Sequence, residues 1–190
     1  MIRPDPELSS RTATVEEALA RTAANLDPDV FSNLIGAPGL SVLRSSMEAL
    51  KADSLSVWLV DRDETHLVVT HSEPYPDFVG YKQSVEEGLV ALVYASEQCL
   101  CENEVYLNAN HSKTVDETLG QVTYAMIATP FYIAGNLKGV LTCVQLKETI
   151  DAPDPPGFSA RNMNRVRRLS AAVERLMNYK LLTILFDLEI

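Results

Sequence analysis

The sequence lacks any long hydrophobic run, and it holds only three cysteines. No apolar stretch reaches about 18 residues, the length that a membrane-spanning helix needs, so we expect no membrane association. The first residues are rich in proline and acids and lack the apolar core of a secretory signal. An odd number of cysteines without such a signal favours the reducing cytoplasm over a disulfide framework.

Extremes of composition are also missing. Apolar residues make up 46% of the 190 residues and charged residues 22%, which is the balance of an ordinary globular protein. This excludes a disordered chain, a collagen and a coiled-coil rod. The length corresponds to about one domain with helical extensions, and it allows a core without disulfide or metal staples.

Positive charge is scarce outside the C-terminal segment. The chain has a net charge of −10, but residues 159–190 hold six basic and three acidic residues, a charge of +3. The remaining 158 residues carry ten basic and 23 acidic ones, a charge of −13. Such an acidic body repels phosphate backbones, so we expect no nucleic-acid partner.

Motifs of nucleotide-dependent or hydrolytic chemistry are absent. There is no phosphate-binding loop, dinucleotide fingerprint or Ser-His-Asp arrangement. The spacing of Cys99 and Cys101 is too short for a zinc site, and His66 and His71, five residues apart, would face opposite ways on one strand. We therefore expect no metal and no cofactor.

Hydrophobic periodicity predicts helices and strands in a mixed order. Thr14 and Glu17 have the spacing of a capping box, which predicts a helix from there to about residue 25. Further helices are expected at 40–52, at 86–96 and from Ser159 almost to the end; strands are expected at 54–60, 66–70, 99–101, 121–133 and 137–147. Apolar residues on both faces of the 54–60 strand indicate a sheet covered on both sides.

Five short motifs follow one another in an order that a known family shares. Glu87-Gly88-Leu89 opens the helix at 86–96, and Cys99–Glu102 places apolar residues before an acid. The other motifs are Thr129-Pro130-Phe131, Gly135 with Gly139-Val140-Leu141, and Phe158-Ser159 before a long helix. Over about residues 40–186 the chain thus resembles a GAF domain, a small-molecule sensor module. It departs from the family at Asn103, where many members have Asp.

The resemblance implies an α+β fold: an antiparallel sheet of five to six strands, with the N- and C-terminal helices on one face and a loop-covered pocket on the other. It divides the chain into an N-terminal extension with a short helix (1–38), a GAF-like domain (39–150), and a proline-rich linker with a long dimerisation and signalling helix (151–190). The cyclic-nucleotide signature of the family and the Cys-His pair that anchors bilins are both absent.

By the same resemblance, two variable loops line the pocket. Flat aromatic walls with a few amides and an imidazole suit a small, partly apolar ligand, although the same aromatics could instead close the core. The candidate ligand-binding residues are Tyr75, Phe78, Tyr81, Tyr106, Asn108, His111 and Tyr124.

The cysteines allow two interpretations. Cys99, Cys101 and Cys143 can be buried residues that act as small hydrophobic groups. The alternative is a thiol enzyme similar to the free methionine sulfoxide reductases, which are GAF-fold enzymes with cysteines around the pocket. There, a thiolate would attack the sulfoxide sulfur, and a second thiol would resolve the intermediate as a disulfide. This chain has Glu86-Glu87 where that family places one of its cysteines.

The last helix carries an apolar stripe at steps of three and four residues, separate from a stripe of arginines. The stripe is longer than a small sheet needs, and GAF domains commonly dimerise through their terminal helices. The expected dimer residues are Val173, Leu176, Met177, Leu181, Ile184 and Leu185.

These features together predict a non-catalytic sensory or regulatory domain of the cytoplasm. We expect it to bind a small molecule and to signal as a homodimer through its terminal helices. The alternatives are the thiol enzyme and a dimerisation scaffold whose pocket is filled by side chains.

Overall fold

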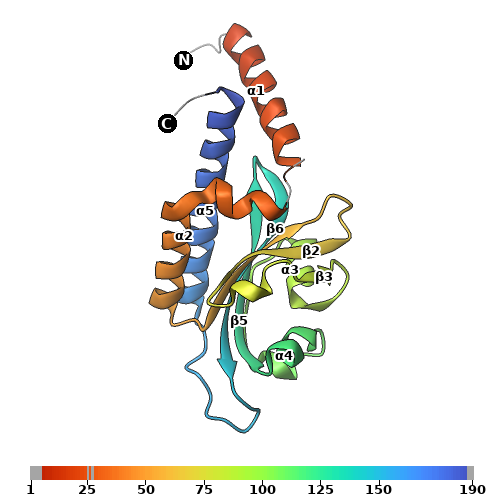
Figure 1. Ribbon diagram of the computed structural model, residues 1–190, viewed down its shortest axis with the longest axis vertical. Helices are drawn as coiled ribbons and strands as arrows, with labels where there is room; N and C mark the ends of the chain where they lie inside the picture. The colour runs from red at the N-terminus through yellow and green to blue at the C-terminus, as the bar shows by residue number, and fades with distance from the viewer. Residues whose placement is uncertain (1–5, 25, 27, 188–190) are drawn as a thin grey trace.

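The computed structural model describes residues 6–24, 26 and 28–187, and its centre is a six-stranded antiparallel sheet (Figure 1). The strand order is β3-β2-β1-β6-β5-β4. The strands are β1 (Ser54–Val60), β2 (His66–Glu73), β3 (Lys82–Ser84), β4 (Leu100–Asn103), β5 (Val122–Ile133) and β6 (Asn136–Lys147). The long hairpin of β5 and β6 therefore lies between the β1–β2 hairpin and the edge strand β4.

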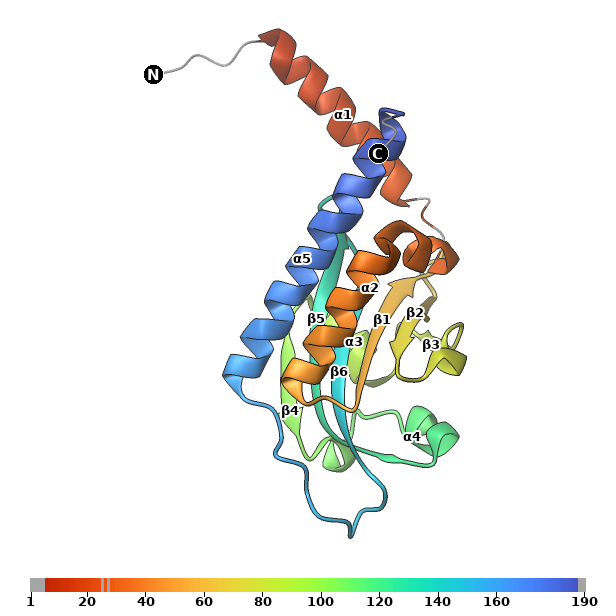
Figure 2. The same ribbon diagram turned by 60° about the vertical axis from the view of Figure 1, so that its left-hand side comes forward.

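Helices cover both faces of this sheet. On one face, α2 (Phe31–Leu50) and α5 (Ala160–Leu185) pack side by side, and α1 (Pro6–Ala24) lies against the end of α5 beyond the sheet (Figure 2). On the other face lie α3 (Gly88–Ser96) and α4 (Thr114–Leu119). The predicted fold class, with terminal helices on one face and loops on the other, is confirmed.

Strand alternation explains why both faces are apolar. Along β1, Leu55, Val57 and Leu59 point into the core shared with α2 and α5, whereas Trp58 belongs to the second core beneath α3. The sheet separates the two cores, and in its β1–β6 pair Leu59 lies opposite Gly139. A Cβ atom at Gly139 would come within 1.7 Å of the Trp58 carbonyl oxygen, so this strand contact requires glycine.

The capping signal at Ser159 is confirmed. Its side chain accepts a hydrogen bond from the backbone N–H of Asn162, and the Asn162 side chain accepts one from the Ser159 backbone, which is the reciprocal pattern of a capping box. The helix that follows places its apolar stripe on the sheet and on α2. Val166, Leu169, Val173, Met177 and Leu181 are buried there.

Three details differ from the sequence prediction. The first helix begins at Pro6 rather than at Thr14, so the predicted capping box at Thr14 and Glu17 is wrong, and both residues lie inside the helix. The second helix begins at Phe31 rather than near residue 40, because Gly36 kinks it (φ 63°, ψ 177°) without ending it. No strand is expected between residues 70 and 99, but the structure has the short strand β3 there.

None of the helices in the described part of the chain combines the length and the apolar content that crossing a membrane requires.

Candidate ligand-binding site

A cavity lies between the sheet and the segments that cover the face opposite α5. The strands β1, β5 and β6 form its floor, and its other walls come from the loop before β3, the start of α3, and α4 with the residues around it. The space open to the centres of water-sized molecules is about 60 Å³, which corresponds to roughly four or five waters. The cavity is therefore not filled by side chains.

The floor of the cavity carries hydroxyl groups on neighbouring strands. Ser56 Oγ lies 3.2 Å from Ser72 Oγ, and the Trp58 indole N–H donates to Thr142 Oγ1 at 3.2 Å. Thr142 Oγ1 in turn donates to the Ser56 carbonyl at 3.4 Å. Ser54 adds a further buried hydroxyl, for which no hydrogen-bond partner is assigned among the described residues. These groups give a bound molecule hydrogen-bond donors and acceptors on a rigid support.

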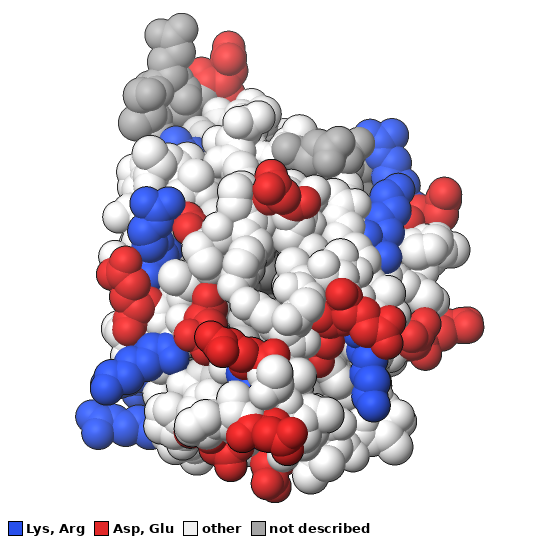
Figure 3. All heavy atoms as spheres, turned by 60° about the horizontal axis from the view of Figure 1, so that its bottom comes forward, with Lys and Arg blue, Asp and Glu red and all other residues white. Residues whose placement is uncertain are grey.

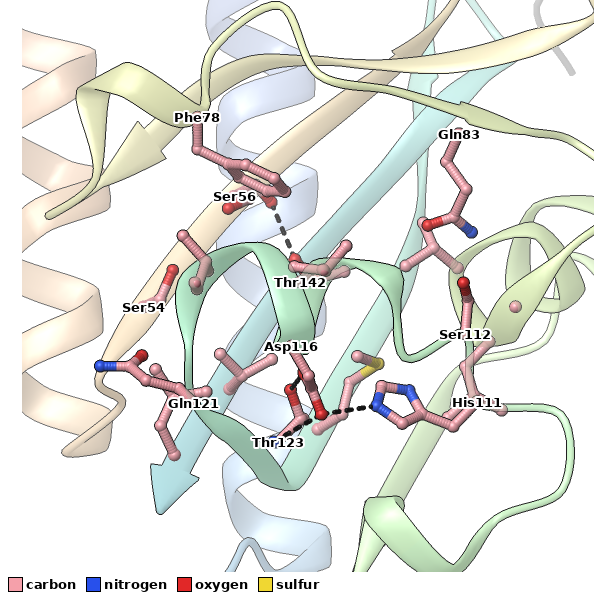
Figure 4. A pocket seen from close by; sticks show the side chains of 18 of the residues that line it. Ser54, Ser56, Phe78, Gln83, His111, Ser112, Asp116, Gln121, Thr123 and Thr142 are labelled. Atoms are coloured by element: carbon pink, nitrogen blue, oxygen red, sulfur yellow. Dashed lines mark hydrogen bonds and ion pairs between the residues drawn. The ribbon is translucent and has the colours of Figure 1, made fainter. Parts of the chain in front are cut away.

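Aromatic rings form the wall beside this floor. Trp58 packs edge-on against Phe78, with ring centroids 5.8 Å apart, and Phe78 stacks on Tyr81 at 4.9 Å. Tyr75, just before the Pro76–Phe78 turn, donates its hydroxyl to Gln121 Oε1 at 3.3 Å. In Figure 4 the Phe78 side chain points inward from this turn towards the strands.

A carboxylate holds α4 against the sheet. Asp116 accepts hydrogen bonds from the Thr123 hydroxyl (2.6 Å) and backbone N–H (3.0 Å), and its Oδ2 lies 3.0 Å from His111 Nε2 (Figure 4). Burial alone would raise the pKa of Asp116, but the hydrogen bonds from His111 and Thr123 outweigh it and hold that pKa below its usual value. The acid is therefore a fixed negative charge in the cavity wall at neutral pH.

The start of α3 closes another side of the cavity. Gly88 has φ +83°, and a Cβ there would come within 2.8 Å of Gln83 Nε2. With glycine in place, Gln83 donates to the Glu87 carbonyl, and Ser112 donates to the Glu87 carboxylate at 2.9 Å. The residues between β4 and α4 are in this way joined to the N-terminal end of α3.

Three of the seven candidate ligand-binding residues line this cavity: Tyr75, Phe78 and His111. Tyr81 supports Phe78 from behind. Tyr106 and Tyr124 lie elsewhere and stack on each other with centroids 6.5 Å apart.

Tyr106 and Tyr124 instead contact the side chain of Lys147. Its Nζ lies over both rings, at 5.5 and 5.7 Å from the centroids, and it also donates to Asp154 and to the Ile150 carbonyl. The seventh candidate, Asn108, donates to the Glu102 carboxylate at 2.7 Å. Sequence reasoning missed the residues of the floor, such as Trp58 and Thr142, although the alternation along β1 separates Trp58 from the residues of the other core.

The cysteines lie away from the cavity. Cys143 is fully buried in the core beneath α2 and α5, and Cys101 packs against the same core. Burial raises the pKa of the Cys143 thiol to about 12 and also raises that of Cys101. All three cysteines are free thiols, and none of them lines the cavity. The described residues contain no group of three or more potential metal ligands.

The expected dimer residues divide into two sets. Val173, Met177 and Leu181 are buried within the chain itself, so they are not available to a partner, and this part of the prediction is corrected. Leu176 packs partly against the same core, and Leu185 is half-buried. Ile184 remains 60% exposed.

Acidic side chains dominate the end of the molecule that lies lowest in Figure 1. Seen from there, Asp and Glu side chains gather around a central hollow, while Lys and Arg lie towards the edges (Figure 3). This distribution agrees with the charge of −13 outside residues 159–190. The field on this side disfavours anions.

Comparison with known proteins identifies the fold. No protein-family model and no curated protein matches the sequence. Among solved structures, the GAF domain of a phosphoenolpyruvate-protein phosphotransferase from Coxiella burnetii is similar at a TM-score of 0.63 and 20% identity, over 88% of this chain and 92% of that one. The corresponding domain from Acinetobacter is similar at a TM-score of 0.60 and 18% identity, over 86% of this chain and 92% of that one.

An enzyme shares the architecture. The free methionine-R-sulfoxide reductase from Neisseria meningitidis, solved in complex with its substrate, is similar at a TM-score of 0.58 and 15% identity, over 95% of each chain. GAF domains and a reductase are thus both similar in fold to this chain. This chain has the GAF-domain fold.

Proposed function

We propose that this chain is a non-catalytic sensory or regulatory domain that binds a small molecule in the cavity above β1, β5 and β6. The observation that carries the proposal is an unfilled cavity with hydroxyl groups on its floor and aromatic rings on its wall. Rigid sheet positions with a few polar groups among apolar ones are typical of small-molecule sites. The similarity in fold to a GAF domain of a two-component sensor histidine kinase supports it further.

A chain of hydrogen bonds offers a route from the cavity to α5. The His111 backbone N–H donates to the Asn108 carbonyl at 3.1 Å, and the Asn108 side chain donates to Glu102 on β4. The next residue, Asn103, exchanges two hydrogen bonds with the backbone of Phe158, just before α5. A ligand that favours one arrangement of His111 and α4 would thereby favour one placement of the start of α5.

Binding can be tested with the single tryptophan. Trp58 lines the cavity and is the only Trp in the sequence, so its fluorescence reports occupancy directly. A thermal-shift screen of amino acids, nucleotides, amines and small acids should find a compound that raises Tm and changes Trp58 emission. Phe78→Ala should abolish both responses. Ile150→Ala, at an apolar side chain 62% exposed in the loop after β6 and outside the cavity, serves as the control. A Tm shift that survives Phe78→Ala unchanged would place the site elsewhere.

The proposal includes a homodimer formed through the ends of α1 and α5. These ends extend past the sheet (Figure 2), and Tyr179, Ile184 and Phe186 are at least half exposed there. Light scattering at roughly 50 µM, where a weak dimer is populated, should give the mass of two chains. Ile184→Glu combined with Phe186→Glu should give a folded monomer. A wild-type monomer at that concentration contradicts this part of the proposal.

The thiol-enzyme alternative requires a thiolate at the bound substrate. Cys101 and Cys143 lie on the opposite face of the sheet, and Cys99 does not line the cavity either. We therefore expect no reduction of free methionine sulfoxide above a no-protein control in an assay coupled to NADPH and thioredoxin. Turnover that disappears in Cys101→Ser would establish the enzyme instead.

A further inference from the structure

The charge of the cavity lining is one-sided. Among the described residues that line it there is no lysine or arginine, whereas Asp116 contributes a carboxylate whose pKa is held low. His111, the one basic side chain of the lining, already pairs with that carboxylate at 3.0 Å. An anion bound here would lie beside Asp116 without a lysine or arginine counter-charge, and such burial is costly.

A nearby lysine does not change this balance. The Lys147 side chain is 3% exposed, and its ammonium group bonds to Asp154 at 2.6 Å and to the Ile150 carbonyl at 2.7 Å. It lies over the rings of Tyr106 and Tyr124, which do not line the cavity. The positive charge of Lys147, at the end of β6, is thus neutralised outside the site.

Three aromatic side chains, Trp58, Tyr75 and Phe78, contribute to the same lining. The face of an aromatic ring is negative, so clustered rings bind organic cations, and quaternary ammonium groups in particular. Tyr81, stacked behind Phe78, and the hydrogen bond from Tyr75 to Gln121 fix this wall in place. The hydroxyls of Ser54 and Ser56 on the floor can bond a polar tail.

From this lining we infer that the ligand of the cavity is a small organic cation, of the class of methylated or quaternary amines that carry a hydroxyl or carbonyl group. Its cationic head would lie against the rings of Trp58 and Phe78 on the side of Asp116, and its polar tail would reach the strand hydroxyls. The inference rests on the proposed binding function, and it adds the sign of the ligand's charge and the ligand's chemical class.

Three probes of one shape and different charge test it on the full-length chain. Choline is the cation. Its neutral isostere carries a tert-butyl group in place of the trimethylammonium group, and tert-butylacetate is the anion. Affinities are measured by Trp58 fluorescence and by calorimetry. We expect choline to bind at least about tenfold more tightly than the neutral isostere, and tert-butylacetate to bind most weakly.

Two variants separate charge recognition from simple fit. Phe78→Leu keeps an apolar wall but removes the ring, so it should weaken choline several-fold and leave the neutral isostere nearly unchanged. Phe131→Leu, the same change in the core on the other face of the sheet, is its control. Asp116→Asn should likewise weaken choline selectively, with the exposed turn residue Asp63 changed to Asn as the control of equal charge. Retained binding of the neutral isostere shows that each variant still has an intact cavity.

The outcomes separate this inference from the proposed function. Equal affinity for choline and the isostere, or tightest binding of the anion, overturns the cationic ligand while small-molecule binding stands. If none of the three probes changes Trp58 emission, the cationic class is overturned as well. The broader compound screen then decides the binding function: a stabilising compound of another class keeps it, and no stabilising compound at all removes both.

Discussion

Replacing Asn103 by Asp tests the connection between β4 and α5 with a change of one atom. Asn103 donates from Nδ2 to the Phe158 carbonyl at 3.1 Å and accepts from the Phe158 N–H at Oδ1 at 2.8 Å. A carboxylate can accept the second bond but cannot donate the first. The substitution would therefore place a negatively charged oxygen against a carbonyl oxygen.

The expected loss of stability follows from these two bonds. A hydrogen bond between neutral groups contributes about 0.5–1.5 kcal/mol net, and leaving a buried partner unsatisfied costs about 1–3 kcal/mol. Gly157 limits relaxation, because a Cβ there would already lie within 2.8 Å of Asn103 Oδ1. We expect Asn103→Asp to lower the free energy of unfolding by roughly 1–3 kcal/mol, with a fall in Tm of about 2–4 °C for each kcal/mol.

Urea unfolding followed by circular dichroism measures this loss. Asn110→Asp makes the same chemical change at an exposed loop residue and should shift stability little. The deficit of Asn103→Asp should also shrink below about pH 4, where a protonated carboxyl regains a donor. If Asn103→Asp is as stable as Asn110→Asp at neutral pH, the hydrogen-bonded connection to Phe158 does not stabilise the fold as argued.

Three further predictions concern buried positions. Burial lowers the pKa of His71, whose Nε2 has no hydrogen-bond partner among the described residues. The unfolded chain therefore binds more protons than the folded one, and the free energy of unfolding should fall as the pH drops below about 6.5. His71→Phe should reduce this pH dependence in urea titrations. Gly139→Ala should lower stability by roughly 3 kcal/mol, at the upper end for overpacking, because its Cβ meets the Trp58 backbone; a native-like unfolding curve would contradict this. The Cys143 thiol, with its pKa raised to about 12, should resist alkylation near neutral pH until urea unfolds the chain, as mass spectrometry of the labelled protein can show.

Much of the fold could be predicted because its signals are local. Alternating apolar residues define β1, and the sequence boundary Ser54–Val60 agrees with the structure. The hydroxyl of Ser159 identifies the start of α5. The error at Thr14 has a local cause as well: a capping-box spacing inside a continuous helix is indistinguishable in sequence from one at its start. The three-residue strand β3 is too short to show a period of two.

The site was harder to predict because its contacts join distant segments. Tyr75 and Phe78 line the cavity, as expected from their loop, but the acid that fixes α4 escaped notice. Asp116 reaches Thr123 only because the chain reverses at Gly120, which has φ +63°. Tyr106 and Tyr124 look like pocket residues in sequence, yet they bind the Lys147 side chain that fixes the following linker.

The terminal helix shows how a correct pattern can lead to an incomplete conclusion. Its apolar stripe is longer than the sheet, as the sequence indicates, but α1 and α2 supply much of the cover, since Leu19, Ala23 and Ile35 belong to the same core as Leu181. What remains exposed is a smaller set around Tyr179, Ile184 and Phe186, which are 50–60% exposed.

That smaller set limits how strongly two chains can associate. Complete burial of a large apolar side chain contributes about 1.5–3 kcal/mol, so half-exposed ones contribute about half as much. Three such residues from each of two chains give roughly 5–9 kcal/mol, against an association cost of about 4–15 kcal/mol. The two terms nearly balance. A homodimer built on this surface alone would therefore form and dissociate over an accessible concentration range, and ligand binding that moved α5 even slightly could shift that equilibrium.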